Sequence, residues 1–385
     1  MSDMFEGKLK QLKEQIKKEK FDAVLISSVS NISYLTGFTN FSKDEREAFL
    51  IIGDDFQYII TDARYSEAIK KDVPHFQLFE RGYKTPVEDL FKTLKKDITS
   101  LGIEEDNLTV SEHRKIKKHF KKTKHFDVNS IRSIKNNEEI KKIETACKIG
   151  DRAFEYVLKK IKAGVTEKQI AQEIEKFIKE NGAEISFPSI VAFGANSSVP
   201  HHQTGNDVLG PSTQLSLRSG REGLIILLDF GVKFENYCSD MTRTVFFGTP
   251  SKKQEDIYNA VLTAQQKAVD FLNLKIKSNK NVSAQQVDKA ARDYIISKGY
   301  SSIPHSLGHG IGLQVHEHPN LSPKSKEVLK EGMVFSIEPG IYIKDFGSPR
   351  STRVEAGGVR IEDLFVYEKG KLRQLTTSPK NLTTV

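Results

Sequence analysis

The stretch REGLIILLDFGV at positions 221–232 returns in altered form as KEGMVFSIEPGI at positions 330–341. The alignment needs no gap, keeps two glycines in register and places Asp229 opposite Glu338. Each copy reads as an apolar strand that carries a carboxylate into the protein. A buried charge costs several kcal/mol unless it is paired or binds a metal. The repeat therefore predicts a partner for two buried acids.

A second strand with a further acid follows each copy. Asp240 lies in YCSDMTRTVFF, and Glu362 lies in GGVRIEDLFVY. In the first copy, an antiparallel hairpin would bring Asp229 and Asp240 to one face of a sheet. Four acids arranged by a duplication predict one shared partner, a cluster of cations.

The duplication extends upstream into a pair of helices. Residues 165–182 align without a gap on residues 282–299, and both carry an apolar stripe at helical spacing. Thr166 and Ser283 occupy the expected N-cap positions, each with a glutamine three residues later, which is the capping-box spacing. A glycine ends each segment, as expected for a helix C-terminus.

A longer amphipathic helix is expected before each capped helix, at roughly 136–162 and 253–275. The repeated unit is helix, helix, strand, strand, which predicts an α+β fold for residues 131–385. Residues 1–130 follow another pattern, strand, turn, strand and then helix, which predicts a separate small α/β domain. A chain of 385 residues suits two domains.

Composition argues against several classes of partner. The net charge of +8 is spread along the chain, and the densest basic run, RKIKKHFKKTK at 114–124, is expected to be a solvated helix face. We therefore expect no nucleic-acid partner.

No apolar run approaches membrane-spanning length, and the start of the chain lacks the features of a secretory signal. Two cysteines, Cys147 and Cys238, fit a reducing compartment, so a cytoplasmic protein is expected.

Histidines gather in one segment, PHSLGHGIGLQVHEHP at 304–319, which contains His305, His309, His316 and His318. Four carboxylates and one imidazole suit a pair of divalent ions such as Mn²⁺, Co²⁺ or Zn²⁺. Two such ions about 3.5–4 Å apart hold a hydroxide that is nucleophilic at neutral pH. The glycines do not follow the GxGxxG spacing of nucleotide sites, and HEHP is not the HExxH pattern.

Five segments, LLDFG, SDMTRT, SLGHGIGLQVHE, SIEPGIY and GGVRIED, resemble the signatures of the pita-bread metallopeptidases, and most closely the Xaa-Pro aminopeptidase and prolidase group. The resemblance covers residues 131–385 and implies a pita-bread catalytic domain behind a creatinase-like N-terminal domain. It implies two divalent ions, Mn²⁺ being the first candidate and Co²⁺ or Zn²⁺ the others. The metal ligands that it implies are Asp229, Asp240, His309, Glu338 and Glu362. Of these, Asp240 and Glu362 are expected to bridge the two ions.

The resemblance also implies roles beside the metals. His201, in SSVPHHQTG, matches the histidine placed over the substrate, and His316 matches the one that hydrogen-bonds the scissile carbonyl as it becomes an oxyanion. A protonated His316 is expected to stabilise that oxyanion. His305 is expected to support the site, and Arg360 to orient the carboxylate two residues later. Glu338 is expected to move a proton from the attacking hydroxide toward the leaving nitrogen.

Within this group the sequence favours an aminopeptidase that removes the first residue from peptides with proline second. Short prolidases carry an arginine just after their HExP segment, whereas this chain has Asn320 there. Arg350 or Arg353 in the insert at 344–356 could replace it, so an Xaa-Pro dipeptidase is the alternative. A methionine aminopeptidase, a creatinase-like enzyme and a non-catalytic binding module are further alternatives. The resemblance also implies a homodimer.

Overall fold

The computed structural model describes residues 2–209, 223–278, 281–343 and 357–385. The chain divides into two compact units, Met1–Arg132 and Ser133–Val385. The sequence-based boundary lies at 130/131, within the short helix that ends the first unit. Each unit is described separately below.

The first unit is built on a mixed six-stranded sheet of order β4-β3-β2-β1-β5-β6. Its strands are β1 (Ala23–Ile26), β2 (Phe49–Gly53), β3 (Gln57–Thr61), β4 (Gln77–Glu80), β5 (Ser100–Ile103) and β6 (Lys122–His125). Its helices are α1 (Ser2–Lys18), α2 (Val29–Thr36), α3 (Ser66–Asp72), α4 (Val87–Leu94), α5 (Val110–Lys117) and α6 (Asn129–Arg132). The unit is an α/β domain, as predicted.

The predicted strand, turn, strand and helix are found as β2, β3 and α3, with Asp54 and Asp55 between the two strands. Helix α2, which the sequence analysis did not place, is held at its start by Glu104, whose carboxylate accepts the backbone N–H groups of Ser27 and Ser28 at 2.5 and 2.7 Å.

One local prediction in this unit is wrong. The basic run is not one helix face, because α5 ends at Lys117, and Lys122 and Lys124 lie on edge strand β6, which pairs in parallel with β5.

The second unit repeats helix, helix and strands. The first half contains α7 (Asn137–Leu158), α8 (Glu167–Glu180), β7 (Glu184–Ile185), β8 (Ile190–Phe193), η1 (Gly194–Ser198), β9 (Leu224–Phe230), β10 (Val232–Phe234), β11 (Tyr237–Cys238) and β12 (Met241–Phe247). The second half contains α10 (Lys252–Lys277), β13 (Val282–Ser283), α11 (Ala284–Ser297), β14 (Gly308–Gly310), β15 (Glu317–Leu321), β16 (Val328–Leu329), β17 (Val334–Ile337), β18 (Gly340–Ile343), β19 (Gly357–Arg360), β20 (Asp363–Glu368) and β21 (Lys371–Gln374).

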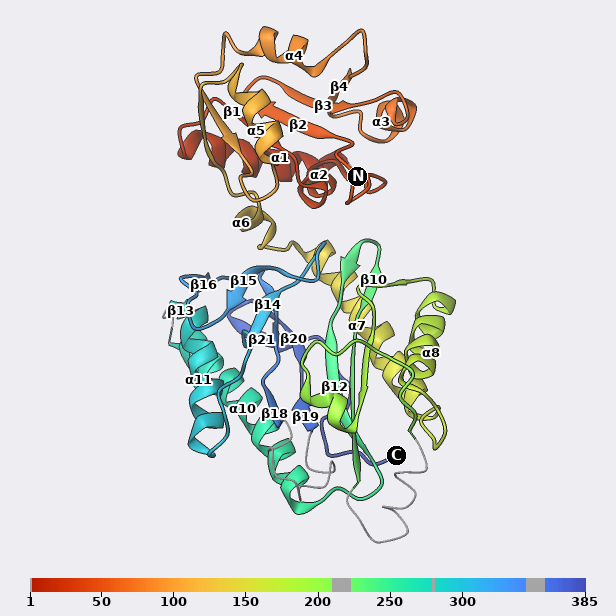
Figure 1. Ribbon diagram of the computed structural model, residues 1–385. Helices are drawn as coiled ribbons and strands as arrows, with labels where there is room; N and C mark the ends of the chain where they lie inside the picture. Colours follow the sequence, from red (N-terminus) through yellow and green to blue (C-terminus); the bar gives the residue numbers. More distant parts are fainter. Residues whose placement is uncertain (1, 210–222, 279–280, 344–356) are drawn as a thin grey trace. The chain divides into compact units, whose positions relative to one another are not determined.

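The strands of the second unit lie between two pairs of helices (Figure 1). One apolar core joins α7 and α8 to the sheet β12-β9-β8, and a larger one joins α10 and α11 to the sheet β15-β14-β17-β20-β21. Each helix pair thus covers the strands of its own half. The acid-bearing ends of the strands are left in the middle of the unit.

The two capped helices differ at their first residues. Thr166 forms the predicted capping box with Gln169, whose backbone N–H donates to the threonine hydroxyl at 3.1 Å. Ser283 is the N-cap of α11 but makes no side-chain cap bond. Its backbone is part of β13, and the next N–H donates to Glu327 O at 3.0 Å, so a neighbouring segment satisfies the helix start.

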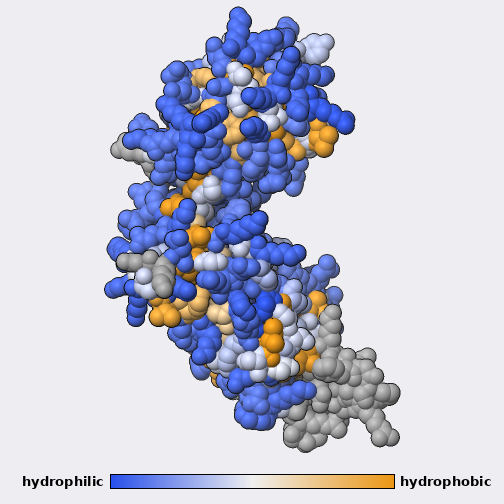
Figure 2. Space-filling model, turned by 90° about the vertical axis from the view of Figure 1, so that its left-hand side faces the viewer, coloured by the Kyte–Doolittle hydropathy of each residue, from blue (hydrophilic) through white to orange (hydrophobic). Residues whose placement is uncertain are grey.

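Figure 2 shows hydrophilic side chains over most of the visible surface of each unit, with smaller hydrophobic patches between them. Among the described residues, no helix is both long and apolar enough to span a membrane.

Candidate metal centre

The first pair of acids is placed by strands β9 and β12, which form the antiparallel pair expected from the sequence. The register puts Thr242 directly opposite Asp229. Thr242 lies two residues after Asp240. Because side chains alternate along a strand, the two side chains face the same side. Both carboxylates therefore lie on one face, and both residues are buried.

His309 is the middle residue of β14, between two glycines that the packing requires. A Cβ on Gly308 would lie 2.0 Å from the carbonyl oxygen of Ser336, and one on Gly310 would lie 2.0 Å from that of His318. Only a residue without a side chain lets these neighbouring backbones come so close. The glycines thus let His309 sit deep in the sheet.

The second pair of acids is held through the backbone. Glu338 directly follows β17, and Glu362 lies between β19 and β20. The N–H of Glu362 donates to Thr242 O at 3.1 Å, which ties the second half to the first. From α10, the buried Gln265 amide donates to the carbonyl oxygens of the residues preceding Glu338 and Glu362, at 3.0 and 3.4 Å.

The predicted ligands meet between the two halves. Ligand atoms of Asp240, His309 and Glu362 all lie within 4.8 Å of one another. His309 Nε2 is 3.6 Å from Asp240 Oδ2 and 3.3 Å from Glu338 Oε1. Four of the five predicted ligands are therefore brought together directly.

Asp229, the fifth, joins the group through Arg360. Arg360 Nη2 donates to Asp229 Oδ2 at 2.5 Å, and Arg360 Nε donates to the hydroxyl of Thr242 at 3.0 Å. That hydroxyl donates in turn to Glu362 Oε2 at 2.8 Å. One buried guanidinium therefore orients two acids, Asp229 directly and Glu362 through Thr242.

Electrostatics at the site are those of crowded, buried acids. Burial, followed by the negative charge of Glu362, raises the pKa of Asp240 well above its usual range. Burial, followed by the charge of Glu338, raises the pKa of Glu362 to about 8. Burial also acts to raise the pKa of Glu338, but the hydrogen bond and positive charge of His309 outweigh it and lower the value to about 2.

The donor set fits divalent cations. Asp240 Oδ1 and Glu362 Oε1 are buried and have no hydrogen-bond partner among the described residues. Unpaired buried carboxylate oxygens are costly, and a cation removes that cost. Carboxylate oxygens with one imidazole suit Mn²⁺, Co²⁺ and Zn²⁺.

The three other predicted histidines differ in their surroundings. The ring of His316 lies 4.3 Å from that of His309, edge to face. His305 is held on both nitrogens, through Nδ1 to Ser306 O at 2.8 Å and through Nε2 to the Tyr342 hydroxyl at 2.9 Å. His201 is exposed. Burial lowers the pKa of both His305 and His316, which favours their neutral forms.

Tyr342 is a site residue that the sequence analysis missed. Its hydroxyl accepts a hydrogen bond from Arg360 Nη1 at 2.9 Å and contacts His305, so it joins the arginine to the histidine segment. Burial raises the pKa of Tyr342 to about 12. Tyr342 ends the quoted segment SIEPGIY, but a hydroxyl in an otherwise apolar strand does not by itself indicate a role in the site.

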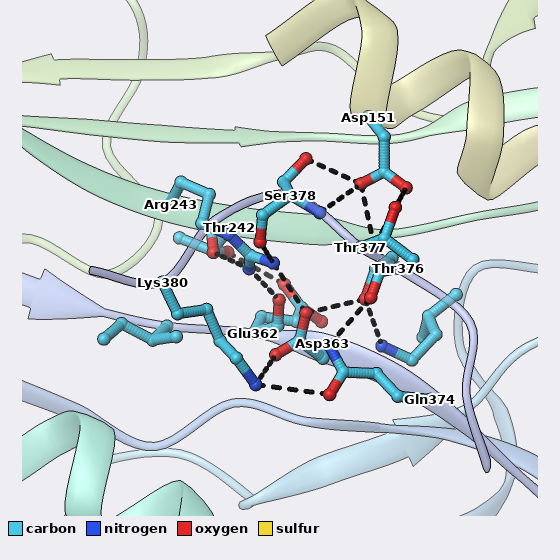
Figure 3. Close-up of polar contacts among 12 residues, drawn as sticks. Asp151, Thr242, Arg243, Glu362, Asp363, Gln374, Thr376, Thr377, Ser378 and Lys380 are labelled. Atoms are coloured by element: carbon cyan, nitrogen blue, oxygen red, sulfur yellow. Dashed lines mark hydrogen bonds and ion pairs between the residues drawn. The ribbon is translucent and has the colours of Figure 1, made fainter. Parts of the chain in front are cut away.

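A buried polar network holds the backbone carbonyl of Glu362 and the side chain of the next residue, Asp363 (Figure 3). Arg243 donates to Glu362 O at 2.5 Å and to Asp363 Oδ1 at 2.6 Å, while Lys380 Nζ lies 2.7 Å from Asp363 Oδ2. Asp151 of α7 accepts hydrogen bonds from the backbone just before Lys380. The network thus connects α7 and the C-terminal segment to the residue next to Glu362.

A duplicated helix–strand unit with acids converging between its halves is the pita-bread metallopeptidase fold, and here a creatinase-type domain precedes it in the sequence. Residues 141–369 match Metallopeptidase family M24, and residues 8–134 match the Creatinase/Prolidase N-terminal domain. The chain belongs to Metallopeptidase family M24.

Known relatives extend over nearly the whole chain. The Xaa-Pro dipeptidase of Pyrococcus horikoshii is 34% identical over 387 residues, covering 99% of each chain. The structure of an Xaa-Pro dipeptidase from Bacillus anthracis has a TM-score of 0.83 at 32% identity, covering 99% of this chain and 100% of that one. The structure of an X-Pro aminopeptidase from Thermotoga maritima has a TM-score of 0.79 at 33% identity, covering 98% and 99%.

The sequence analysis used Asn320, and the possible replacements Arg350 and Arg353, to choose between an aminopeptidase and a dipeptidase. Arg350 and Arg353 lie outside the described residues. Asn320 is exposed on β15, directly across the strand pair from His309. An asparagine therefore stands beside the metal centre at the place where an arginine was sought.

Proposed function

We propose that this chain is a metal-dependent Xaa-Pro dipeptidase that hydrolyses the bond before proline. The observation that carries the proposal is the meeting of Asp240, His309, Glu338 and Glu362, with buried carboxylate oxygens lacking partners, in a member of family M24. The names of the relatives favour the dipeptidase over the aminopeptidase that the sequence favoured.

Two divalent ions, proposed to be Mn²⁺, would be held by the five predicted ligands and would supply Lewis acidity and a water of lowered pKa. As a metal ligand, Glu338 would be ionised at neutral pH and could accept a proton on a carboxylate oxygen. It can then return that proton to the leaving nitrogen. Asp229 and Asp240 would face the free amino group of the substrate.

His316 is proposed to donate an N–H to the carbonyl oxygen of the scissile bond. The sequence analysis expected a protonated imidazole there. Burial, followed by the charge of His309, lowers the pKa of His316, so the neutral ring is favoured near pH 7. A neutral imidazole still has one N–H donor, which is enough to stabilise the developing oxyanion.

The second candidate is an Xaa-Pro aminopeptidase. Asn320 supports this candidate, because its amide binds the free carboxylate of a dipeptide less strongly than an arginine with two parallel donors would. An enzyme that acts on longer peptides does not need that contact. The X-Pro aminopeptidase of Thermotoga maritima is also among the similar structures.

The test is hydrolysis of matched peptides, Ala-Pro, Ala-Pro-Ala and Ala-Ala-Ala, by dialysed protein with Mn²⁺, Co²⁺ or Zn²⁺ restored. Metal-dependent cleavage of Ala-Pro with little cleavage of Ala-Pro-Ala supports the dipeptidase. Release of alanine from Ala-Pro-Ala with Ala-Pro left intact would replace it with the aminopeptidase. No cleavage of any peptide with any metal would overturn both candidates.

A further inference from the structure

Glu167, the first residue of α8, is a fully buried carboxylate with no place in the metal centre. Its relative exposure is 0%, and both oxygens are saturated by donors. Oε1 accepts the N–H of Phe193 and the side-chain amide of Asn196, both at 2.8 Å. Oε2 contacts His202 Nε2 at 2.9 Å and accepts the N–H of Gly205 at 3.0 Å.

All four donors belong to one segment, residues 193–205, which runs from the end of β8 through η1. A single carboxylate thus holds both ends of this segment and two side chains between them. The backbone adds to the grip, because Lys168 N donates to Gly205 O at 3.0 Å. Hydrogen bonds to a charged acceptor are roughly twice as strong as neutral ones.

The same segment is held from the side of the metal centre. Arg360 Nη1 donates to Pro200 O at 3.2 Å, and the backbone N–H of Gly358 donates to the hydroxyl of Ser197 at 2.8 Å. There is no room for a side chain here, since a Cβ on Gly358 would lie 2.2 Å from Ser197 O. The segment is therefore fixed between α8 and β19.

His201 lies between the two anchors. The residue before it, Pro200, is held by Arg360, and the residue after it, His202, is held by Glu167. His201 itself is exposed, and it directly follows Pro200, whose carbonyl is bound by the same Arg360 that contacts Asp229, so its backbone lies beside the metal centre. The two adjacent histidines thus differ: His202 is bound by Glu167, whereas His201 is exposed beside the site.

We propose that Glu167 is a positioning residue for the reaction, which acts by holding the 193–205 segment so that His201 stays over the substrate. This inference rests on the proposed function, since it assigns His201 a contact with the substrate. Misplacing a group by about 1 Å can cost roughly 100-fold in rate. A carboxylate that fixes both sides of His201 therefore controls catalysis without touching the substrate.

The first measurement compares Glu167→Gln with Glu180→Gln by hydrogen exchange of the metal-free protein. Both variants replace a glutamate of α8 by its neutral isostere, but Glu180 is exposed. In Glu167→Gln the new NH₂ group meets the Gly205 N–H, so the amide protons of 193–205 should exchange about tenfold faster. Glu180→Gln should exchange like wild type. Unchanged exchange of 193–205 in Glu167→Gln would overturn the anchoring.

The second measurement is a double-variant cycle with His201→Ala, read as kcat and KM on the cleaved peptide, together with bound metal. Glu167→Gln alone should lower kcat by about 10- to 100-fold at unchanged metal content. In the His201→Ala background the same change should cost less than about threefold, because coupled sites are not additive. Full multiplication of the two losses, or loss of metal in Glu167→Gln, would overturn the proposed route through His201.

If Glu167→Gln does not fold, a second variant, His202→Leu, tests the same proposal. His202→Leu removes one donor from a half-buried position, and it should speed exchange at 199–205 and lower kcat in the same way; no change in either would overturn the proposal. The two hypotheses fail separately. Wild-type protein that cleaves no Xaa-Pro peptide overturns the proposed function, whereas the exchange experiment needs no activity and still decides the anchoring.

Discussion

Arg360 connects more of the site than any other side chain described above. It contacts Asp229, Thr242 and Tyr342, and it is almost fully buried. The sequence analysis expected it to orient Glu362. The structure shows that this link runs through the Thr242 hydroxyl, while the direct contact of the guanidinium is with Asp229.

We predict that Arg360→Lys lowers kcat/KM by about 10- to 100-fold, the usual cost of losing a group that orients metal ligands. Lysine keeps the charge but lacks the planar fork that reaches four partners, Asp229, Thr242, Tyr342 and the carbonyl of Pro200. Steady-state kinetics at saturating metal test this. Arg373→Lys, which alters a partly exposed pair with Glu144 and Glu368, is the matched control and should stay near wild type. Equal activity of both variants would contradict the assignment.

We predict opposite effects of Asp240→Asn on the metal-free and metal-loaded protein. Without metal the variant should melt at a higher temperature than wild type, because it removes a buried charge that burial and Glu362 make unfavourable. With metal it should lose the rise in melting temperature that ligand binding gives. Thermal melting with and without EDTA, alongside metal analysis, measures both. A metal-induced rise equal to that of wild type would argue against Asp240 as a ligand.

At this scale the sequence predicted the acids better than their neighbours. Asp229 and Glu338 could be found because the duplication repeats them within apolar strands. Thr242 and Tyr342 could not, because their roles come from the β9–β12 register and the β18–β19 pairing, which bring distant residues to Arg360. Hydroxyl groups in strands carry no such signal by themselves.

Among the elements, α8 and α11 show how far a repeated pattern predicts repeated structure. Both helices form where the alignment places them, and glycines with φ of +72° and +83° follow them at positions 182 and 299. Their first turns differ, because the first N–H of α11 donates to the carbonyl of Glu327, just before strand β16. An alignment of two segments contains no information about which neighbour packs against each.

We therefore predict unequal costs for two similar cap mutations. Thr166→Ala should lower the free energy of unfolding by about 1 kcal/mol, because it removes the bond to Gln169 N. Ser283→Ala should cost less than about 0.5 kcal/mol, because its hydroxyl makes no cap bond. Urea unfolding of the two variants and wild type gives both values. A larger loss for Ser283→Ala would contradict the observed cap geometry.

The second helix of the second half also holds a histidine segment, by different residues from α8. Asp288 of α11 pairs with Arg292 at 2.7 Å, and Arg292 Nη2 donates to His305 O at 2.9 Å. Asp288 also accepts the N–H of Leu307 at 3.2 Å. In both halves, a buried carboxylate of the second helix thus restrains a segment that carries a site histidine.

For the whole molecule, removal of metal should make stability depend on pH. Glu362 has an ordinary pKa of 4.5 and a folded value of about 8, so between these values the folded form binds more protons than the unfolded form. Stability therefore falls as pH rises through this window. Burial raises the pKa of Asp229 and Asp240 as well, which gives the same sign.

His309 adds to the loss above pH 6.5. Although burial opposes it, the hydrogen bond to Glu338 raises the pKa of His309 to about 9, so its contribution disappears as pH rises from 6.5 through 9. Below pH 6.5 the lowered pKa values of His305 and His316 act in the opposite direction. We therefore predict that the melting temperature of EDTA-treated protein falls from pH 6.5 to pH 8, within the range set by the raised pKa values. Protein with saturating Mn²⁺ should show a much smaller fall. Parallel curves for the two forms would contradict the cluster of acids.

The division of the ligands between the two halves has a consequence for the history of the gene. Asp229 and Asp240 come from the first half, and His309, Glu338 and Glu362 come from the second, joined across the middle by the bond from Glu362 N to Thr242 O. Neither half alone has the full set. If one ancestral half-length chain preceded the duplication, it had this site only where two copies paired. Fusion would then have freed the two copies to diverge, so that the first half now has two aspartates and the second has a histidine and two glutamates.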